Sequence, residues 1–217
     1  TLSGAVTYAD GVRGQAFSFT NGEILCGTVA GNLGTSDFTI AFWYRLPGGS
    51  VNTNSPQFIS KRGVCNFGNF LDLRGTRFDL FTGTCDRTPF LPNVAGGDQW
   101  YHVAYQRQGG VLRVYRDGVV IVEQSGCVGA LNNDAPLRFS GGACTNVDGT
   151  SRLIGQMDEI QIYNRALAPL EIASLAAVEI AAVSGETDNA LVNFDDDVIV
   201  KAEVTLPAGS LGQYNVI

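Results

Sequence analysis

Two neighbouring carboxylates, Asp158 and Glu159, are the first candidates for chemistry in this chain. Enzymes that cleave glycosidic bonds by acid and base catalysis need two carboxylates that flank one bond, a few ångströms apart. Successive side chains of a β-strand point to opposite faces of the sheet, so we expect these two to be kept apart. Asp79 and Asp86 lie too far apart along the chain to serve instead.

The chain has a single histidine, His102, in the segment WYHVA. A Ser-His-Asp triad would have to use this histidine. A jelly-roll lyase would also need it, together with a tyrosine and an arginine such as those of QIYNR (161–165). No GxSxG nucleophile motif, Gly-rich phosphate loop or zinc cluster accompanies it. We therefore expect a protein that is not an enzyme, with His102 in a structural role.

The charge balance excludes one class of partner. Fourteen basic residues stand against 21 acidic ones, a net charge of −7, whereas phosphate binding needs clustered Lys and Arg. Nucleic acid is therefore not an expected partner. No apolar run reaches the roughly 18 residues of a membrane span, so no membrane insertion is expected. The chain starts at Thr1, as a mature secreted protein would, and as a fragment of a longer chain would too.

Five cysteines indicate an oxidising, extracellular compartment. Cys65 and Cys85 are equally distant from Gly75, the expected tip of a hairpin, so they are predicted to face each other and form a disulfide. Cys127 and Cys144 flank the LNNDAP loop and its neighbouring strand and are predicted as the second pair. Metal binding is the alternative for these residues, but no CxxC spacing is present.

Cys26 is left over by these pairings. We interpret it as a buried thiol, with a bridge to another chain as the alternative.

Short strand patterns recur along the chain. FTIAFWYRL (38–46) alternates large apolar residues with others at the period of a sheet strand. WYHVAYQRQ (100–108) precedes VLRVYRDGVVIV (111–122), a hairpin with an Asp-Gly tip. One short helix is predicted at 169–177, with Pro169 in its first turn and Leu170, Ile172 and Leu175 as its buried stripe. The pattern predicts an all-β protein of two packed antiparallel sheets.

Four separated segments carry a family resemblance: GQAFSF (14–19), FTIAFWYRL (38–46), WYHVAYQR (100–107) and MDEIQIYNRALAPLEI (157–172). Together they resemble the laminin-G-like jelly roll of the concanavalin A-like superfamily, over roughly residues 4–176. The resemblance implies a jelly-roll domain over 1–183. It also implies that the tryptophan and the histidine of WYHVA form a structural pair, which includes His102. It does not specify function, because the superfamily holds lectins, adhesion modules, spacers and glycan-cleaving enzymes.

The resemblance also implies a structural calcium ion. Its ligands would be Asp158 and the backbone carbonyls around Asn21, Gly22 and Glu23, which would join the first part of the domain to its last strand. The alternative is that Asp158 caps neighbouring backbone amides or pairs with an arginine.

Arginines and aromatic residues on neighbouring strands are the candidates for ligand binding. We single out Arg45, Arg107, Arg113 and Tyr105, since a basic sheet face with an aromatic ring can bind an acidic glycan or a protein carboxylate. Core packing of the ring and a solvated sheet face are the alternatives for these residues.

Residues 184–217 lie beyond the resemblance and contain two strand-like runs, ALVNF and DVIVKAEVTL. Two strands cannot bury a core, so this β-rich extension must pack on the domain, pair with another chain or begin a further domain. We expect a secreted or cell-surface recognition module that binds glycan or an extracellular partner. The alternatives are a structural subunit that self-assembles through 184–217, and a polysaccharide-active enzyme.

Overall fold

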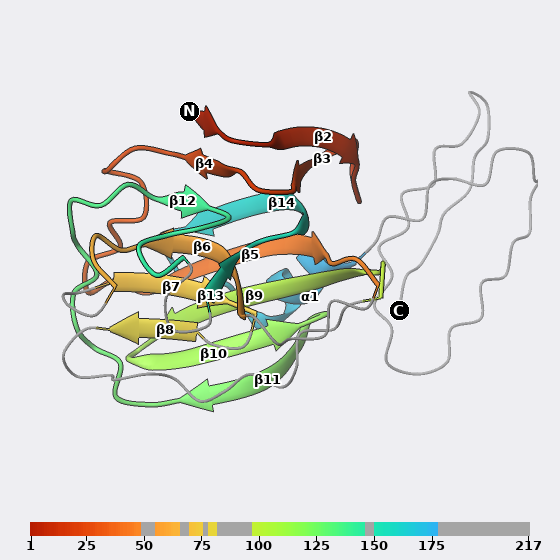
Figure 1. The fold of residues 1–217 in the computed structure, drawn as a ribbon. Helices are drawn as coiled ribbons and strands as arrows, with labels where there is room; N and C mark the ends of the chain where they lie inside the picture. Colours follow the sequence, from red (N-terminus) through yellow and green to blue (C-terminus); the bar gives the residue numbers. More distant parts are fainter. Residues whose placement is uncertain (49–54, 66–69, 76–77, 82–96, 146–149, 178–217) are drawn as a thin grey trace, which may run out of the picture. The chain divides into compact units, whose positions relative to one another are not determined.

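The computed structural model describes residues 1–48, 55–65, 70–75, 78–81, 97–145 and 150–177. Thr1–Ala176 form one compact unit. The predicted extension, 184–217, lies outside the described residues. Two seven-stranded sheets pack face to face, as expected for a jelly-roll sandwich (Figure 1). All pairings within them are antiparallel except one, between β13 and β6.

The strands of both sheets are given in spatial order. The first sheet runs β1 (Leu2–Ser3), β4 (Glu23–Leu25), β12 (Arg138–Phe139), β6 (Ser55–Lys61), β7 (Phe70–Arg74) and β8 (Phe78–Phe81), with β13 (Thr150–Arg152) beside β6. The second runs β11 (Val119–Gln124), β10 (Val111–Arg116), β9 (Trp100–Gln108), β5 (Phe38–Arg45), β14 (Gly155–Tyr163), β3 (Gln15–Phe19) and β2 (Val6–Asp10).

Strand β5 occupies the centre of the second sheet and is buried on both faces. Phe38, Ile40 and Phe42 enter the core between the sheets, as the alternation predicts. Ala41 and Trp43 face the other way and are also buried, Ala41 in a second, smaller core with helix α1 (Pro169–Ala176). The helix packs on the outer face of this sheet (Figure 1), so the sheet is covered from both sides over its central strands.

Helix α1 begins at Pro169, as predicted, and its Ile172 is fully buried. Leu170 is 69% exposed and does not belong to the buried stripe, which corrects the sequence interpretation. The carboxylate of Glu171 accepts a hydrogen bond from Ala168 N at 2.7 Å and pairs with Arg165 at 2.6 Å, which secures the first turn. Within the part of the chain that the structure describes, no helix has the length and apolar character to span a membrane.

The predicted Asp117-Gly118 tip joins β10 to β11. Both residues have positive φ, 49° and 83°, the combination of a tight two-residue hairpin turn. The Asp117 side chain reaches back to strand β9, where its Oδ1 accepts from His102 N at 2.9 Å, while Asp117 N donates to His102 O at 3.0 Å. Burial raises the pKa of the Asp117 carboxyl group.

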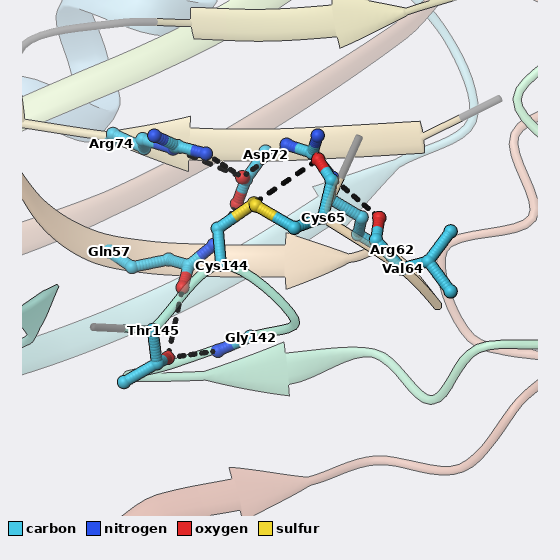
Figure 2. Close-up of a disulfide and its surroundings, with 9 residues drawn as sticks. All are labelled: Gln57, Arg62, Val64, Cys65, Asp72, Arg74, Gly142, Cys144 and Thr145. Atoms are coloured by element: carbon cyan, nitrogen blue, oxygen red, sulfur yellow. Dashed lines mark hydrogen bonds and ion pairs between the residues drawn. A yellow bond between two sulfur atoms is a disulfide. The ribbon is translucent and has the colours of Figure 1, made fainter. Parts of the chain in front are cut away.

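The predicted cysteine pairings are wrong. Cys65 is bonded to Cys144, with their Cα atoms 4.7 Å apart (Figure 2). The turn after β12 folds back over β6 and brings Cys144 to Cys65, instead of keeping it across the LNNDAP loop from Cys127. Cys127 is itself disulfide-bonded and fully buried. Cys26 is a free thiol and is exposed, contrary to the expectation of burial.

Replacing both Cys65 and Cys144 by serine should lower the free energy of unfolding by about 4 kcal/mol, because the bond closes a long loop in the unfolded chain. Urea unfolding followed by tryptophan fluorescence measures the loss. Cys26→Ser is the matched control and should unfold like the wild type. Equal stability of the double variant and the control would contradict the assigned role of the bond.

Candidate functional site

A buried polar cluster lies on the outer face of β6 and β7. It consists of Gln57, Ser60, Arg62, Asp72 and Arg74, and we call it the β6–β7 cluster. Figure 2 shows all of these side chains except that of Ser60. Leu71 and Leu73 of β7 enter the sandwich core, so the alternation of the strand turns Asp72 and Arg74 outward. Ser60 pairs directly with Asp72 across the ladder.

Asp72 is the centre of this cluster and is fully buried. Its Oδ2 accepts from Arg74 Nε at 3.0 Å and Nη2 at 2.8 Å, and from Arg62 Nη1 at 3.3 Å. Its Oδ1 accepts from Gln57 Nε2. A buried charge with partners on both oxygens is a structural brace, because removing one partner leaves the others desolvated and unpaired.

The disulfide loop covers one side of the cluster. Thr145 Oγ1 lies 3.5 Å from Gln57 Oε1 and accepts from Gly142 N at 2.9 Å (Figure 2). A Cβ atom at Gly142 would come within 2.4 Å of Ser60 Oγ, so only glycine permits this close approach. The cluster is therefore closed by this loop rather than open as a preformed ligand site.

A second polar group lies in a hollow on the outer face of the other sheet. The hollow is lined by Arg13, Ala41, Trp43, His102, Glu159, Gln161 and Leu175, and we call it the His102 hollow. The imidazole of His102 packs edge-on against the Trp43 indole, with ring centroids 5.4 Å apart. Its Nδ1 is buried and makes no hydrogen bond. His102 thus packs against a tryptophan of strand β5, and not against Trp100 of its own segment, WYHVA, which the resemblance indicated.

A bulge in β14 shapes one wall of the hollow. The pairing of β14 with β5 shifts register between Asp158 and Gln161, and Glu159 takes a left-handed backbone, φ 47°. Met157 and Ile160 on either side both contact the sandwich core. The extra residue therefore allows Asp158 and Glu159 to face outward together.

Both carboxylates turn towards the β2–β3 hairpin. Asp158 Oδ2 accepts from Val12 N at 2.7 Å and Arg13 N at 3.0 Å, and its Oδ1 accepts from Glu159 N at 2.8 Å. Glu159 Oε2 accepts from Arg13 Nη1 at 3.4 Å. The expectation that the strand period separates these two side chains is wrong, because it assumed a regular strand.

The predicted calcium ligands are not brought together. Gly155 pairs with Phe19, so Asp158 and Asn21 lie five residue steps apart along the ladder, roughly 16 Å. The carboxylate of Glu23, which is not the predicted ligand atom of this residue, pairs with Arg138 at 3.7 Å. Gly22 packs against Ala5 and Val6. No group of three His, Cys, Asp or Glu side chains within the described ranges can hold a metal. Asp158 caps backbone amides, the alternative left open by the sequence, and calcium binding stays a prediction.

The four predicted ligand residues do not share a face. Tyr105 is buried in the core, stacked on Phe42 with ring centroids 6.0 Å apart, and burial raises the pKa of its hydroxyl. Arg107 is 1% exposed and donates to the carbonyl oxygens of Gly34 at 2.8 Å and Gly129 at 2.8 Å. Both are therefore parts of the sandwich rather than of its surface.

The other two arginines lie at separate places on the second sheet. Arg113 pairs with Glu123 at 2.7 Å. Arg45 is the last residue of β5 and pairs with Trp100 of β9, whereas Arg113 pairs with Gln106 of the same strand. Six residues of β9 separate these two positions, a distance of roughly 20 Å along the strand. Sequence reasoning missed the contributions of Arg13 and Gln161. The spacing of Met157 and Ile160, three residues instead of two, was the signal of the bulge.

Removing the Asp158 carboxylate should leave the amides of Val12 and Arg13 without acceptors. We expect Asp158→Ala to lower the free energy of unfolding by about 2 kcal/mol or more, by the same amount in calcium and in EDTA. Asp10→Ala, an exposed aspartate of the same hairpin, is the control. If Asp158 bound calcium, EDTA would lower the melting temperature of the wild type and would leave that of the variant unchanged.

His102 should make the stability of the protein fall in acid. Burial, and to a lesser degree the nearby Arg13, lowers the pKa of His102 from 6.5 to about 4. Between these values the unfolded chain takes up a proton that the folded chain does not, so stability falls by about 1.4 kcal/mol for each unit of decreasing pH. Relative to His102→Gln, the wild type should lose about 2–3 kcal/mol more from neutral pH to about pH 4.5 in urea unfolding. Parallel pH curves would contradict this.

Comparison with solved structures supports the architecture. The binding domain of Paraclostridial Mosquitocidal Protein 1 is similar with a TM-score of 0.62 and 19% identity, over 81% of this chain and 47% of that one. A second similar structure is domain 4 of AbnA, a GH43 extracellular arabinanase from Geobacillus stearothermophilus, in complex with arabinotriose. Its TM-score is 0.57 and its sequence identity 18%, and the match covers 81% of this chain and 87% of that domain. The botulinum neurotoxin serotype G binding domain has a TM-score of 0.58 and 19% sequence identity, and the match covers 81% of this chain and 46% of that one.

This chain therefore spans about half the length of the two toxin domains. No curated protein matches the sequence. The sequence model of the concanavalin A-like lectin/glucanases superfamily matches residues 19–173, which is more than half of the chain. With two packed antiparallel sheets and a single short helix in its described part, the protein belongs to this superfamily.

Proposed function

We propose that this chain is a non-catalytic recognition module that binds glycan or an extracellular protein. The observation that carries the proposal is the match to domain 4 of the arabinanase, a domain solved in complex with arabinotriose and covered over 87% of its length. Several other similar structures are likewise named binding domains, including one in complex with synaptotagmin II. The fold thus recurs in domains that bind sugar or protein.

The chemistry of the described side chains supports binding rather than catalysis. His102, the only histidine of the chain, is 1% exposed and held against Trp43. Asp72 is enclosed by two arginines, and Asp158 is saturated by three backbone amides. A general acid or base must reach its substrate within hydrogen-bond distance, and these groups are occupied by structural partners.

The disulfides support an extracellular setting for this module. The bond between Cys65 and Cys144, together with the bonded state of Cys127, is typical of proteins outside the reducing cytosol. Self-assembly through 184–217, the alternative function, concerns residues outside the described part of the chain.

Binding without turnover is the expected result on an oligosaccharide panel. The purified protein should be retained by at least one immobilised glycan from a panel of neutral oligosaccharides, arabino-oligosaccharides included, and of sialylated ones. The same glycans in solution should show no new reducing ends after incubation. A panel without any binder would contradict glycan recognition, and release of reducing ends would show that the protein is an enzyme.

A further inference from the structure

One aromatic side chain of the domain differs from the others in its exposure. Tyr8 lies in β2, the last described strand at one edge of the second sheet (Figure 1), and is 60% exposed. It is the one aromatic residue among the exposed large apolar side chains of the described part of the chain. We propose that Tyr8 and its neighbours in the β2–β3 hairpin bind a neutral sugar residue of a glycan. The inference rests on the proposed glycan recognition and assigns it to this hairpin.

The ladder of the hairpin places four side chains on one face. Tyr8 pairs with Phe17, and Asp10 pairs with Gln15. Residues two apart in a strand point to the same face, so both pairs lie on one side of the hairpin. Opposite side chains are about 5 Å apart and successive pairs about 7 Å apart, which is the scale of one sugar ring. We call these four residues the Tyr8 platform.

Contacts with the sandwich core hold the aromatic part of the platform. The rings of Tyr8 and Phe17 lie 5.6 Å apart between their centroids, and those of Phe17 and Phe19 lie 6.4 Å apart. Phe19 is buried in the core, and Phe17 is half-buried against it. The exposed ring is therefore supported by a row of rings that leads into the core. A ring held in this way can pack against the C–H groups of a sugar at a small cost in conformational entropy.

The polar part of the platform lies beside the hairpin turn, which is itself fixed. Gly11 N donates to Gly14 O at 3.0 Å, and Asp158 accepts from the two amides between them at 2.7 Å and 3.0 Å. Asp10 and Gln15 flank this turn and are exposed, and neither side chain makes a hydrogen bond or ion pair within the described part of the chain. A carboxylate accepts hydrogen bonds, and a carboxamide both donates and accepts them. Together they match neighbouring hydroxyl groups of a sugar.

The charge of the platform selects neutral sugars. Asp10 is its one charged member, in a chain with a net charge of −7. Arg13 is the only basic residue of the β2–β3 hairpin, and its guanidinium pairs with Glu159 at 3.4 Å. An acidic sugar would therefore meet a carboxylate where it needs a guanidinium or an ammonium group. A neutral sugar has hydroxyl groups that can donate to Asp10 without this repulsion.

The test uses the full chain, and its probe is the strongest neutral oligosaccharide binder from the panel. Tyr8→Ala should weaken binding about 10-fold or more in titration calorimetry, because the sugar loses its ring contact. Tyr8→Phe restores the ring and should recover most of the lost affinity. Leu170→Ala is the matched control, because Leu170 is likewise exposed, at 69%, but lies on helix α1. It should bind as the wild type does.

A second measurement uses the wild type and does not depend on how well a variant folds. Tetranitromethane nitrates accessible tyrosine rings, and trypsin releases residues 1–13 as a peptide in which Tyr8 is the only tyrosine. Mass spectrometry of this peptide therefore reports on Tyr8 alone. Saturating oligosaccharide should suppress its nitration.

The outcomes separate the site from the function. If a neutral glycan binds while Tyr8→Ala has wild-type affinity and the nitration of Tyr8 is unchanged, the platform is wrong and the recognition function stands. If Tyr8→Ala instead abolishes a concentration-dependent dimer, the platform is a contact between copies of the chain and the sugar site is wrong. A panel with only acidic binders overturns the neutral-sugar assignment, and a panel with no binder overturns both the function and the site.

Discussion

Burial of strand β5 on both faces is the constraint on which the rest of this domain depends. One face of the strand contributes phenylalanines and isoleucine to the core between the sheets. The other face carries Ala41 and Trp43, which are also buried, and helix α1 covers part of this face. A strand with water on neither side needs apolar or fully bonded groups throughout. This explains why Thr39 is buried with its hydroxyl donating to Arg165 O and accepting from Leu167 N. The central strand thereby fixes the segment that leads into the helix.

Several charged residues in the described part of the chain are buried and serve as internal braces. Arg107 holds loop carbonyls, Lys61 donates to Thr28 O and Ala135 O at 2.7 Å each, and Asp72 holds two arginines. Each brace joins segments that the sheets alone would leave without hydrogen-bond partners. The sequence predicts Arg107 as part of a binding surface, yet its guanidinium binds the protein's own backbone.

The sequence was sufficient for the architecture, because periodicity reports the type of element and the face that each side chain takes. The β5 alternation, the Asp-Gly hairpin and the helix start at Pro169 are all local signals, and all are confirmed. Disulfide pairing and site geometry depend on non-local contacts. The predicted Cys127–Cys144 pair assumed a simple loop, whereas the chain after β12 folds back over β6. The separation of Asp158 from Glu159 assumed a regular strand, and one inserted residue reversed it. The irregular spacing of Met157 and Ile160 was the one local sequence signal of the bulge that turns Asp158 and Glu159 to the same face.

The place of β14 in the second sheet has a consequence for how the protein is made. This strand, Gly155–Tyr163, lies between β5 and β3, and the β2–β3 hairpin joins the sheet only through it. Strands β2 and β3 therefore wait for β14, which is synthesised long after them, before they gain their neighbour in the sheet. During that interval Phe17 and Phe19 have no sheet to cover, and contacts so distant in sequence form slowly. A nascent domain that still lacks β14 therefore leaves the β2–β3 hairpin without its only partner among the described strands of this sheet.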